Sequence, residues 1–260
     1  MSKQRVVVHD SAETLAAAAA ARLITRLVDA QEARGVASVV LTGGRAGTGM
    51  LEQIAASPAR DAVRWSDVEF FWGDERFLPD GDPERNETQA RRALLDHVDV
   101  DPERVHPMAP SDGKFGDAPD EAAAHYAEVL ATTSERATDI PVPAFDVLLL
   151  GVGEEGHTAS LFPGTPYVRE AGRTVVGVRD CPKPPPTRIS LTLPAIRSAR
   201  EVWLLAAGED KARAAAIALS GAGEIQAPAA GAYGRSRTLW LLDAAAASQL
   251  PRSLYPPASP

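Results

Sequence analysis

Residues 145–164 read FDVLLLGVGEEGHTASLFPG, and this stretch decides both the predicted fold and the predicted site. Its first six residues are almost wholly apolar, as in a strand that is buried on both faces of a parallel sheet. Glycines then turn the chain and bring His157 into a polar run. Ligands of open α/β sheets bind at the carboxyl ends of the strands. An imidazole also moves protons readily near neutral pH, so we expect His157 to be catalytic.

An isolated histidine is more often a core residue whose ring nitrogens bond to the backbone, and this alternative applies to His157 as well. Its place in a glycine-rich turn directly after a buried strand favours catalysis. The other histidines form no H-x-x-x-H or Cys/His cluster with it; they are His9, His97, His106 and His125. We therefore expect no metal site.

Strand-like and helix-like segments alternate on both sides of this stretch. Strands are expected at residues 5–9, 38–41, 68–72, 174–178, 188–193, 201–206 and 238–242. Helices are expected at residues 11–34, 47–56, 83–97 and 118–133 and from about residue 208. This order predicts a Rossmann-like, doubly wound α/β fold with a mostly parallel sheet and helices on both faces. No linker divides the chain, so we expect one domain over residues 1–260, with a flexible loop at 220–235 and a frayed tail after about residue 251.

The chain has 260 residues, a net charge of −8 and one cysteine, Cys181. The negative charge argues against nucleic-acid binding, and no apolar run approaches the ~20 residues needed to span a bilayer. A lone cysteine forms no intrachain disulfide, which suits the reducing cytoplasm. We expect a cytoplasmic protein that binds neither nucleic acid nor membrane and is a monomer or a small homo-oligomer. An acidic protein that binds an anion must gather its cations at one place.

Thr42, Gly43 and Gly44 lie between a predicted strand and a predicted helix. Glycines at such a position let the backbone approach a ligand, and free N–H groups at a helix start bind phosphate. The alternative is a tight turn that needs positive φ. The turn is not a Walker A loop, because no Gly-Lys-Ser/Thr follows it.

Gly151, Gly153 and Gly156 match the dinucleotide fingerprint G-x-G-x-x-G, which makes an oxidoreductase an alternative. The two glutamates inside the match would repel a pyrophosphate, however, and Pro163 ends any following helix too early. The acidic residue expected about 20 positions later, at the end of a second strand, is also missing. The match therefore carries little weight.

Asp74, Glu75 and Arg76 bring two carboxylates and a guanidinium to the carboxyl end of the predicted strand 68–72. Such an edge suits a polar site, whereas the alternative is a surface ion pair worth about 0–1 kcal/mol. The polar residues further along the chain are expected to be helix caps and surface groups; they are Asn86, Thr88 and Gln89.

Arg188 opens the predicted strand 188–193 after a proline-rich loop, and Lys211 falls in the first turn of a predicted helix. The helix dipole makes that turn an unfavourable place for a cation unless an anion lies close by. A solvent-exposed lysine, offset by Glu209 and Asp210, explains the sequence equally well.

Together these segments resemble the 6-phosphogluconolactonase family, hydrolases of the oxidative pentose-phosphate pathway. The motifs occur in the family's order, together with a polar stretch through Asn86; they are LTGG (41–44), FFWGDERFLP (70–79), FDVLLLGVGEEGHTASLFPG (145–164), RISLT (188–192) and GEDK (208–211). The resemblance implies a single Rossmann-like α/β domain, no cofactor and a sugar-phosphate lactone as substrate. Two residues depart from the family pattern: Arg45 stands where Ser or Thr is usual, and Glu155 where Asp is common.

From this resemblance we predict that His157 acts as a general base on a water molecule. The residues expected to hold the 6-phosphate are Thr42, Gly43, Gly44, Arg45, Arg188 and Lys211. Asp74 is expected to orient the sugar hydroxyls or the histidine, and Arg76 to support the site electrostatically. No covalent intermediate is required.

Two further alternatives stay open: a glucosamine-6-phosphate deaminase or isomerase of the same fold, and a non-catalytic sugar-phosphate sensor. The deaminases continue their histidine motif into an Asn-Glu-Pro segment, whereas this chain has Ser160, Leu161, Phe162 and Pro163 there. The missing glutamate favours the lactonase. Sensors usually carry a DNA-binding module, and residues 1–37 contain no helix-turn-helix with a basic face.

Overall fold

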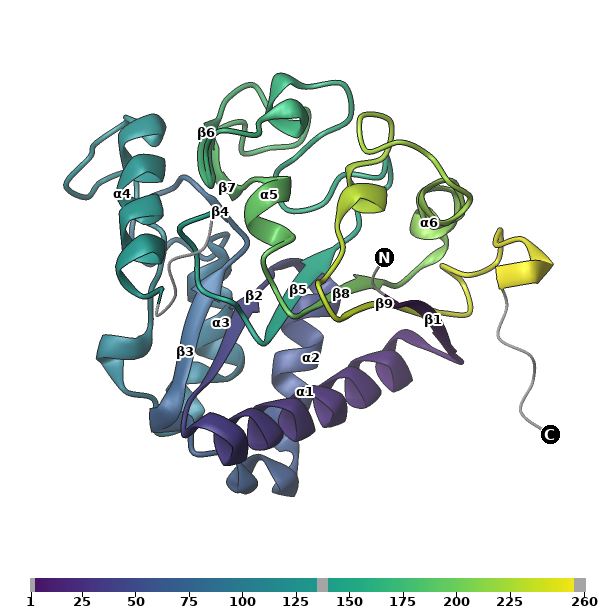
Figure 1. The fold of residues 1–260 in the computed structure, drawn as a ribbon, viewed down its shortest axis with the longest axis horizontal. Helices are drawn as coiled ribbons and strands as arrows, with labels where there is room; N and C mark the ends of the chain where they lie inside the picture. The colour runs from purple at the N-terminus through teal and green to yellow at the C-terminus, as the bar shows by residue number, and fades with distance from the viewer. Residues whose placement is uncertain (1–2, 135–139, 255–260) are drawn as a thin grey trace.

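The computed structural model describes residues 3–134 and 140–254, and a six-stranded parallel sheet forms its centre (Figure 1). The strand order is β1-β9-β8-β5-β2-β3. The strands of this sheet are β1 (Lys3–His9), β2 (Ala37–Leu41), β3 (Val68–Trp72), β5 (Val147–Gly151), β8 (Glu201–Ala206) and β9 (Arg237–Asp243). The central strands are near-continuous apolar runs because helices cover both of their faces, and Val39, Leu148 and Leu204 are all fully buried.

The sheet order reverses between β2 and β5. From β2 the chain continues to the edge strand β3, whereas after β5 it builds the other half of the sheet with β8 and β9. The loops that follow β2 and β5 therefore diverge from adjacent strand ends and open a crevice, which is the usual ligand site of such sheets. The Gly151 N–H donates to Thr42 Oγ1 at 3.2 Å and ties the two strand ends together.

Helices lie on both faces of the sheet, as predicted. α1 (Ala12–Arg34) and α2 (Gly44–Ala56) lie on one face, and α5 (Leu193–Ile196) and α6 (Ala212–Leu219) lie on the other (Figure 1). α1 begins at Ser11, whose hydroxyl accepts the Thr14 N–H, and ends at Gly35 with φ of 81°. The remaining helices are α3 (Asn86–Ala93) and α4 (Pro119–Thr132).

A second, antiparallel sheet of order β4-β7-β6 stands beside the main one. Its strands are β4 (Asp74–Arg76), β6 (Val175–Val178) and β7 (Arg188–Leu191), and α4 packs against β6. Asp74 pairs with Ser190, and Arg76 pairs with Arg188. The sequence did not predict β4, because three residues are too few for a periodic pattern.

Two other segments differ from expectation. The predicted helix 83–97 is confined to α3, since the backbone leaves helical geometry at Leu94. The prediction of a flexible loop at 220–235 is wrong: Ala227 and Ala229 are buried, and the Ala229 N–H donates to the Gly156 carbonyl at 3.0 Å. This segment therefore braces the turn that carries His157.

Short 3₁₀ turns complete the structure; they are Pro58–Ala62, Trp65–Asp67, Leu95–His97, Pro102–Arg104, Pro166–Arg169, Glu209–Lys211, Pro228–Gly231 and Arg252–Leu254. Most of the tail that was expected to fray lies outside the described residues, and the single-domain assignment stays a prediction.

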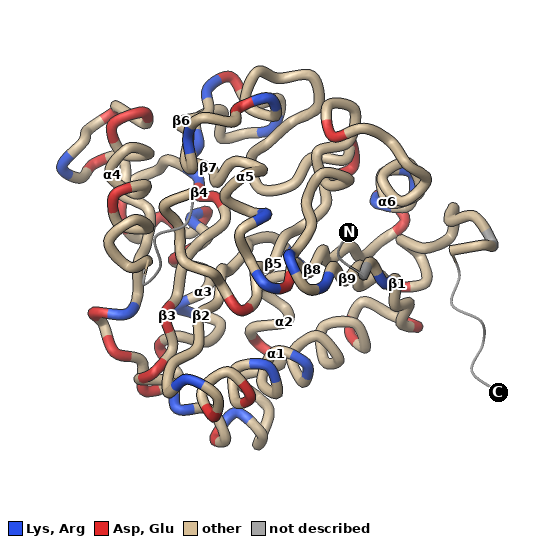
Figure 2. The backbone as a smooth tube through the Cα atoms, viewed as in Figure 1, with Lys and Arg blue, Asp and Glu red and all other residues tan. Residues whose placement is uncertain are grey.

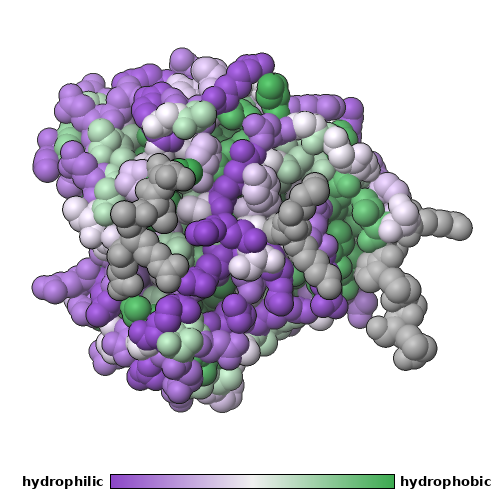
Figure 3. Space-filling model, in the orientation of Figure 1, coloured by the Kyte–Doolittle hydropathy of each residue, from purple (hydrophilic) through white to green (hydrophobic). Residues whose placement is uncertain are grey.

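Acidic and basic residues are interspersed along the backbone (Figure 2), and the face in Figure 3 is mainly hydrophilic with small hydrophobic patches. Within residues 3–134 and 140–254, no helix is long and apolar enough to cross a membrane. The same residues contain no cluster of three or more His, Cys, Asp or Glu side chains that could hold a metal ion.

Candidate active site

A cavity of about 600 Å³ lies in the crevice at the carboxyl ends of the parallel strands. It is bordered by the ends of β2, β5 and β8, by β4 and by residues of the 183–188 segment. Every residue predicted to belong to the site lines this cavity; these residues are Thr42, Gly43, Gly44, Arg45, Asp74, Arg76, His157, Arg188 and Lys211. Their roles stay predictions, but the fold brings them to one place.

The His157 ring sits mostly buried at the cavity, held by its own turn. It packs on the Phe162 ring with centroids 4.3 Å apart. A Cβ on Gly153 would come within 1.9 Å of His157 Nδ1, so the ring occupies space that only glycine leaves. Gly156 completes the turn with φ of 86°, a left-handed conformation suited to glycine. The glycines around His157 therefore seat an imidazole rather than a dinucleotide.

The two ring nitrogens of His157 have different surroundings. Glu155 Oε2 lies 3.1 Å from Nδ1, close enough for charge attraction but without the alignment of a good hydrogen bond. The neighbouring imidazole lowers the pKa of Glu155 to about 2, so this carboxylate is ionised at neutral pH. Nδ1 is buried and makes no hydrogen bond among the described residues, whereas Nε2 is not buried in this way and takes part in none of their hydrogen bonds. An anion beside Nδ1 and a free Nε2 suit a ring that exchanges a proton at Nε2.

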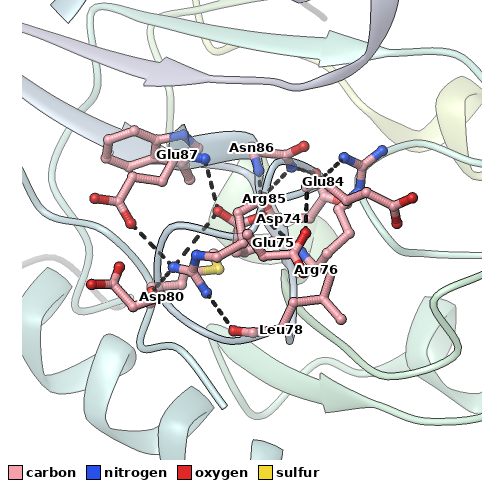
Figure 4. Close-up of polar contacts among 12 residues, drawn as sticks. Asp74, Glu75, Arg76, Leu78, Asp80, Glu84, Arg85, Asn86 and Glu87 are labelled. Carbon is pink, nitrogen blue, oxygen red and sulfur yellow. Dashed lines mark hydrogen bonds and ion pairs between the residues drawn. The ribbon is translucent and has the colours of Figure 1, made fainter. Parts of the chain in front are cut away.

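Four hydrogen-bonded groups form what we call the buried wall: Asp74, Glu75, Asn86 and Ser160. Ser160 donates its hydroxyl to Asp74 Oδ2 at 2.6 Å. Asn86 Nδ2 donates to the Asp74 carbonyl at 2.8 Å (Figure 4). The prediction that Asn86 is a surface group or cap is wrong, because it is only 3% exposed. Asp74 thus lines the cavity with its carboxylate held by Ser160 at Oδ2 and, at the longer distance of 3.4 Å, by Asn86 Nδ2 at Oδ1.

Glu75 lies behind Asp74 and is fully buried. Its carboxylate accepts the backbone N–H groups of Arg76, Asn86 and Glu87 at 2.6–2.9 Å, which fixes the start of α3 against β4 (Figure 4). Burial raises the pKa of Glu75 to about 7, although the nearby Arg85 guanidinium and the three N–H donors oppose this rise. Arg85 is also fully buried, with its Nη2 3.9 Å from Glu75 Oε2, and no sequence pattern predicted this buried pair.

Arg76 extends from the face of β4 opposite to that of Glu75. Its Nη1 donates to the Glu84 carbonyl at 2.6 Å, and the residue is half-buried at the cavity edge (Figure 4). In the antiparallel ladder it pairs with Arg188, which places two guanidinium-bearing residues on neighbouring strands. This concentration of positive charge favours an anionic ligand.

Three further cations form what we call the cationic rim: Arg45, Lys183 and Lys211. Lys183 Nζ lies 3.4 Å from both Glu154 and Glu155. Lys211 Nζ lies 3.0 Å from Asp210 and 3.6 Å from Glu154. Arg45 is 3.8 Å from Asp210, and its side chain is 89% exposed. Sequence reasoning missed Lys183, for which the only signal is a lone cation in a proline-rich loop.

Arg188 is 6% exposed and organises the loop that carries Lys183. Its Nε donates to the Pro185 carbonyl, and its Nη2 donates to the carbonyls of Lys183 and Pro184, at 3.1–3.2 Å. Nη1 has no hydrogen-bond partner in the part of the chain that the structure describes. Arg188 can therefore offer one nitrogen to a ligand while the others hold the loop.

The start of α2 completes the cavity. Gly43 is the N-cap and offers no side-chain cap, so the first N–H groups of this helix are left for a ligand. A free imidazole nitrogen, several cations and a helix N-terminus thus meet at a switch point of a parallel sheet. The fold is of the α/β class, and the arrangement of the site suits a small anionic ligand and proton transfer at an imidazole.

Comparisons with known proteins identify the family. The family described as glucosamine-6-phosphate isomerases/6-phosphogluconolactonase matches residues 10–240. The 6-phosphogluconolactonase of Streptomyces coelicolor is 70% identical, with 98% of each chain covered. That of Mycobacterium tuberculosis is 53% identical over 96% of this chain and 100% of its own. The chain belongs to this family.

Solved structures support the fold. The structure of 6-phosphogluconolactonase from Trypanosoma brucei superposes with a TM-score of 0.83 at 26% identity, covering 96% of this chain and 100% of that one. A monomeric glucosamine-6-phosphate deaminase gives a TM-score of 0.76 at 20% identity, over 94% and 99% of the two chains. At that identity the second match shows a shared fold and no more.

Proposed function

We propose that this chain is a lactone hydrolase that converts 6-phospho-D-glucono-1,5-lactone to 6-phospho-D-gluconate in the oxidative pentose-phosphate pathway. The observation that carries the proposal is the His157 ring in the same cavity as Arg188 and Lys211. The relatives named 6-phosphogluconolactonase, at 50–70% identity over nearly the whole chain, support the same substrate.

A δ-lactone is an activated ester, so the enzyme needs to orient a water molecule, remove its proton and stabilise an oxyanion. In the proposed reaction, His157 Nε2 takes a proton from water as the water oxygen bonds to the lactone carbonyl carbon. The tetrahedral intermediate then breaks its bond to the ring oxygen, and the imidazolium returns the proton to that oxygen. Glu155, close to Nδ1, stabilises the imidazolium between the two steps.

The phosphate is held at the opposite part of the cavity in this proposal. The N-terminus of α2 supplies N–H groups at Gly43 and Gly44, and Thr42 supports their turn through Gly151. Arg188 and Lys211 supply positive charge, with Arg45 at the outer edge. Asp74, whose carboxylate is held by Ser160, orients sugar hydroxyls, and Arg76 adds to the positive potential.

A coupled assay on freshly generated 6-phosphogluconolactone, corrected for spontaneous decay, tests the proposal. We expect the protein to accelerate hydrolysis strongly and to act much less on unphosphorylated glucono-1,5-lactone. A rate no higher than spontaneous decay would contradict the lactonase assignment. Ammonia release from glucosamine 6-phosphate would instead favour a deaminase, although residues 160–163 supply no carboxylate for that reaction. We also propose a cytoplasmic location, which suits the lone Cys181.

A further inference from the structure

Asn86 contains a buried acceptor that the described residues leave unsatisfied. Its backbone N–H donates to Glu75 at 2.6 Å, and its Nδ2 donates to the Asp74 carbonyl at 2.8 Å (Figure 4). Its Oδ1, however, has no hydrogen-bond partner within residues 3–134 and 140–254. An unpaired buried acceptor costs about 1–3 kcal/mol. The unpaired acceptor of a residue that lines the cavity therefore requires an explanation.

The orientation of this amide is determined by its neighbours. Nδ2 faces two acceptors of Asp74, the carbonyl at 2.8 Å and Oδ1 at 3.4 Å. A flipped amide would place an oxygen against both of them, and no donor would compensate. Oδ1 therefore points away from Asp74, toward the turn that starts α2.

The oxygen of Asn86 occupies the place where a side chain on Gly43 would be. A Cβ built on Gly43 would lie 1.8 Å from Asn86 Oδ1 and 2.5 Å from its Cγ. The backbone of Gly43 has φ of −85° and ψ of −164°, a conformation open to any residue. Gly44 is the reverse case: a Cβ there meets nothing within 4 Å, but its φ is +77°. The two adjacent positions thus require glycine for different reasons, a neighbouring side chain at Gly43 and the backbone conformation at Gly44.

We infer that Asn86 is a positioning residue, a wedge that sets the spacing between the α2 turn and Asp74, and that residue 43 is glycine to admit it. The wedge contacts Gly43 on one side and hydrogen-bonds Asp74 on the other, while Glu75 holds its backbone. Building on the proposed function, it joins the part of the site that holds phosphate to the carboxylate that orients the sugar. A substrate held at both ends is sensitive to that spacing.

A double-mutant cycle tests the steric part without any substrate. Gly43→Ala should strongly lower the urea midpoint or abolish folding, and Asn86→Ala should lower it moderately. The double variant Gly43→Ala/Asn86→Ala should recover to about the level of Asn86→Ala alone. A double variant that is less stable than Gly43→Ala, or that still fails to fold, overturns the wedge.

Two controls separate size from other effects. Asn86→Asp keeps the volume of the side chain, so it should not rescue Gly43→Ala. Gly44→Ala is strained by its own backbone, so Asn86→Ala should not rescue it either. Rescue in either control would mean that general loosening, and not removal of the wedge, explains the recovery.

The positioning part is read from kinetics. Asn86→Ala should lower kcat for the phosphorylated lactone about 10–100-fold, with a smaller change in KM. The loss should be several-fold smaller for unphosphorylated lactone, which is not anchored at the α2 turn. Equal losses for the two lactones, or an unchanged kcat, would contradict the positioning role. If the wild type lacks lactonase activity, the proposed function fails, whereas the stability cycle still decides the wedge.

Discussion

The cationic rim and two residues of the buried wall, Asp74 and Asn86, line one cavity, but the two regions are built in opposite ways. In the buried wall, every member is at most 6% exposed and is held by hydrogen bonds of 2.6–3.1 Å. In the cationic rim, the side chains are 18–89% exposed and pair with carboxylates at 3.0–3.8 Å. Buried hydrogen bonds determine geometry, since breaking them leaves unpaired groups.

Exposed ion pairs contribute little to stability, about 0–1 kcal/mol each, and salt weakens them. Glu154 and Asp210, the exposed carboxylates that pair with the rim, can therefore give way to a phosphate at low cost. We propose a division of labour in which the wall orients the sugar part of the ligand and the rim attracts its charge.

The largest effect is expected for His157→Ala, which removes the proposed general base. We expect kcat to fall about 10²–10⁴-fold, the usual contribution of a positioned acid–base group. Lactone hydrolysis measures the loss, and urea unfolding checks that the variant is folded. His125→Ala, on α4 and outside the cavity, is the control. Near-normal turnover in folded His157→Ala would remove His157 from the mechanism.

The next effect lies in the buried wall. Glu75→Ala should lower the free energy of unfolding by about 3 kcal/mol, because two buried N–H groups and one partly buried N–H group lose their acceptor. Urea denaturation at pH 5.5 measures it, with the exposed Glu121→Ala on α4 as control. A loss no larger than that of the control would show that the wall does not depend on this carboxylate.

Glu75 also predicts a pH dependence of stability. Its pKa is raised from the ordinary 4.5 to about 7 in the folded protein, so the folded state binds the proton more tightly than the unfolded state does. The contribution of this group to stability is therefore present below pH 4.5 and declines as the pH rises to about 7, by up to about 3 kcal/mol.

In Glu75→Gln this position carries no group that titrates in this pH range. The difference in unfolding free energy between the wild type and Glu75→Gln should consequently shrink from pH 4.5 to pH 8 in urea titrations. A difference that is constant over this range would contradict the raised pKa.

A smaller effect is expected in the cationic rim. Lys211→Ala should raise KM for the phosphorylated lactone about tenfold and leave kcat nearly unchanged, because it removes attraction for the phosphate and not for the reacting carbon. Steady-state kinetics at low and high salt measure it, and the mutational effect should diminish with salt. An equal rise in KM for unphosphorylated lactone would show that Lys211 does not act on the phosphate.

The smallest effect is expected for Arg45, the rim residue that departs from the family pattern. Arg45→Ser should change KM less than about threefold, since an exposed charge is screened by solvent. The same kinetic assay measures it. A change as large as that of Lys211→Ala would place Arg45 in direct contact with the ligand.

The His157 turn could be predicted because its determinants are close in sequence. The buried strand, Gly153 and Glu155 all lie within a few residues of the ring that they seat or contact. Asn86 could not be predicted in the same way, because it depends on Gly43 and on Asp74, which is 12 residues away. Lys183 likewise meets Glu154 across 29 residues.

By itself, the sequence determined the succession of strands and helices, the parallel sheet and the placement of His157 after a buried strand. These follow from hydrophobic periodicity and from the backbone preferences of glycine and proline, which act over a few residues. The tertiary structure was needed to show that β4 joins a second sheet, that Asn86 and Glu75 are buried, and that Gly43 leaves room for the side chain of Asn86. Burial and pairing arise between segments that meet only in the folded chain, so the pattern of no single segment contains them.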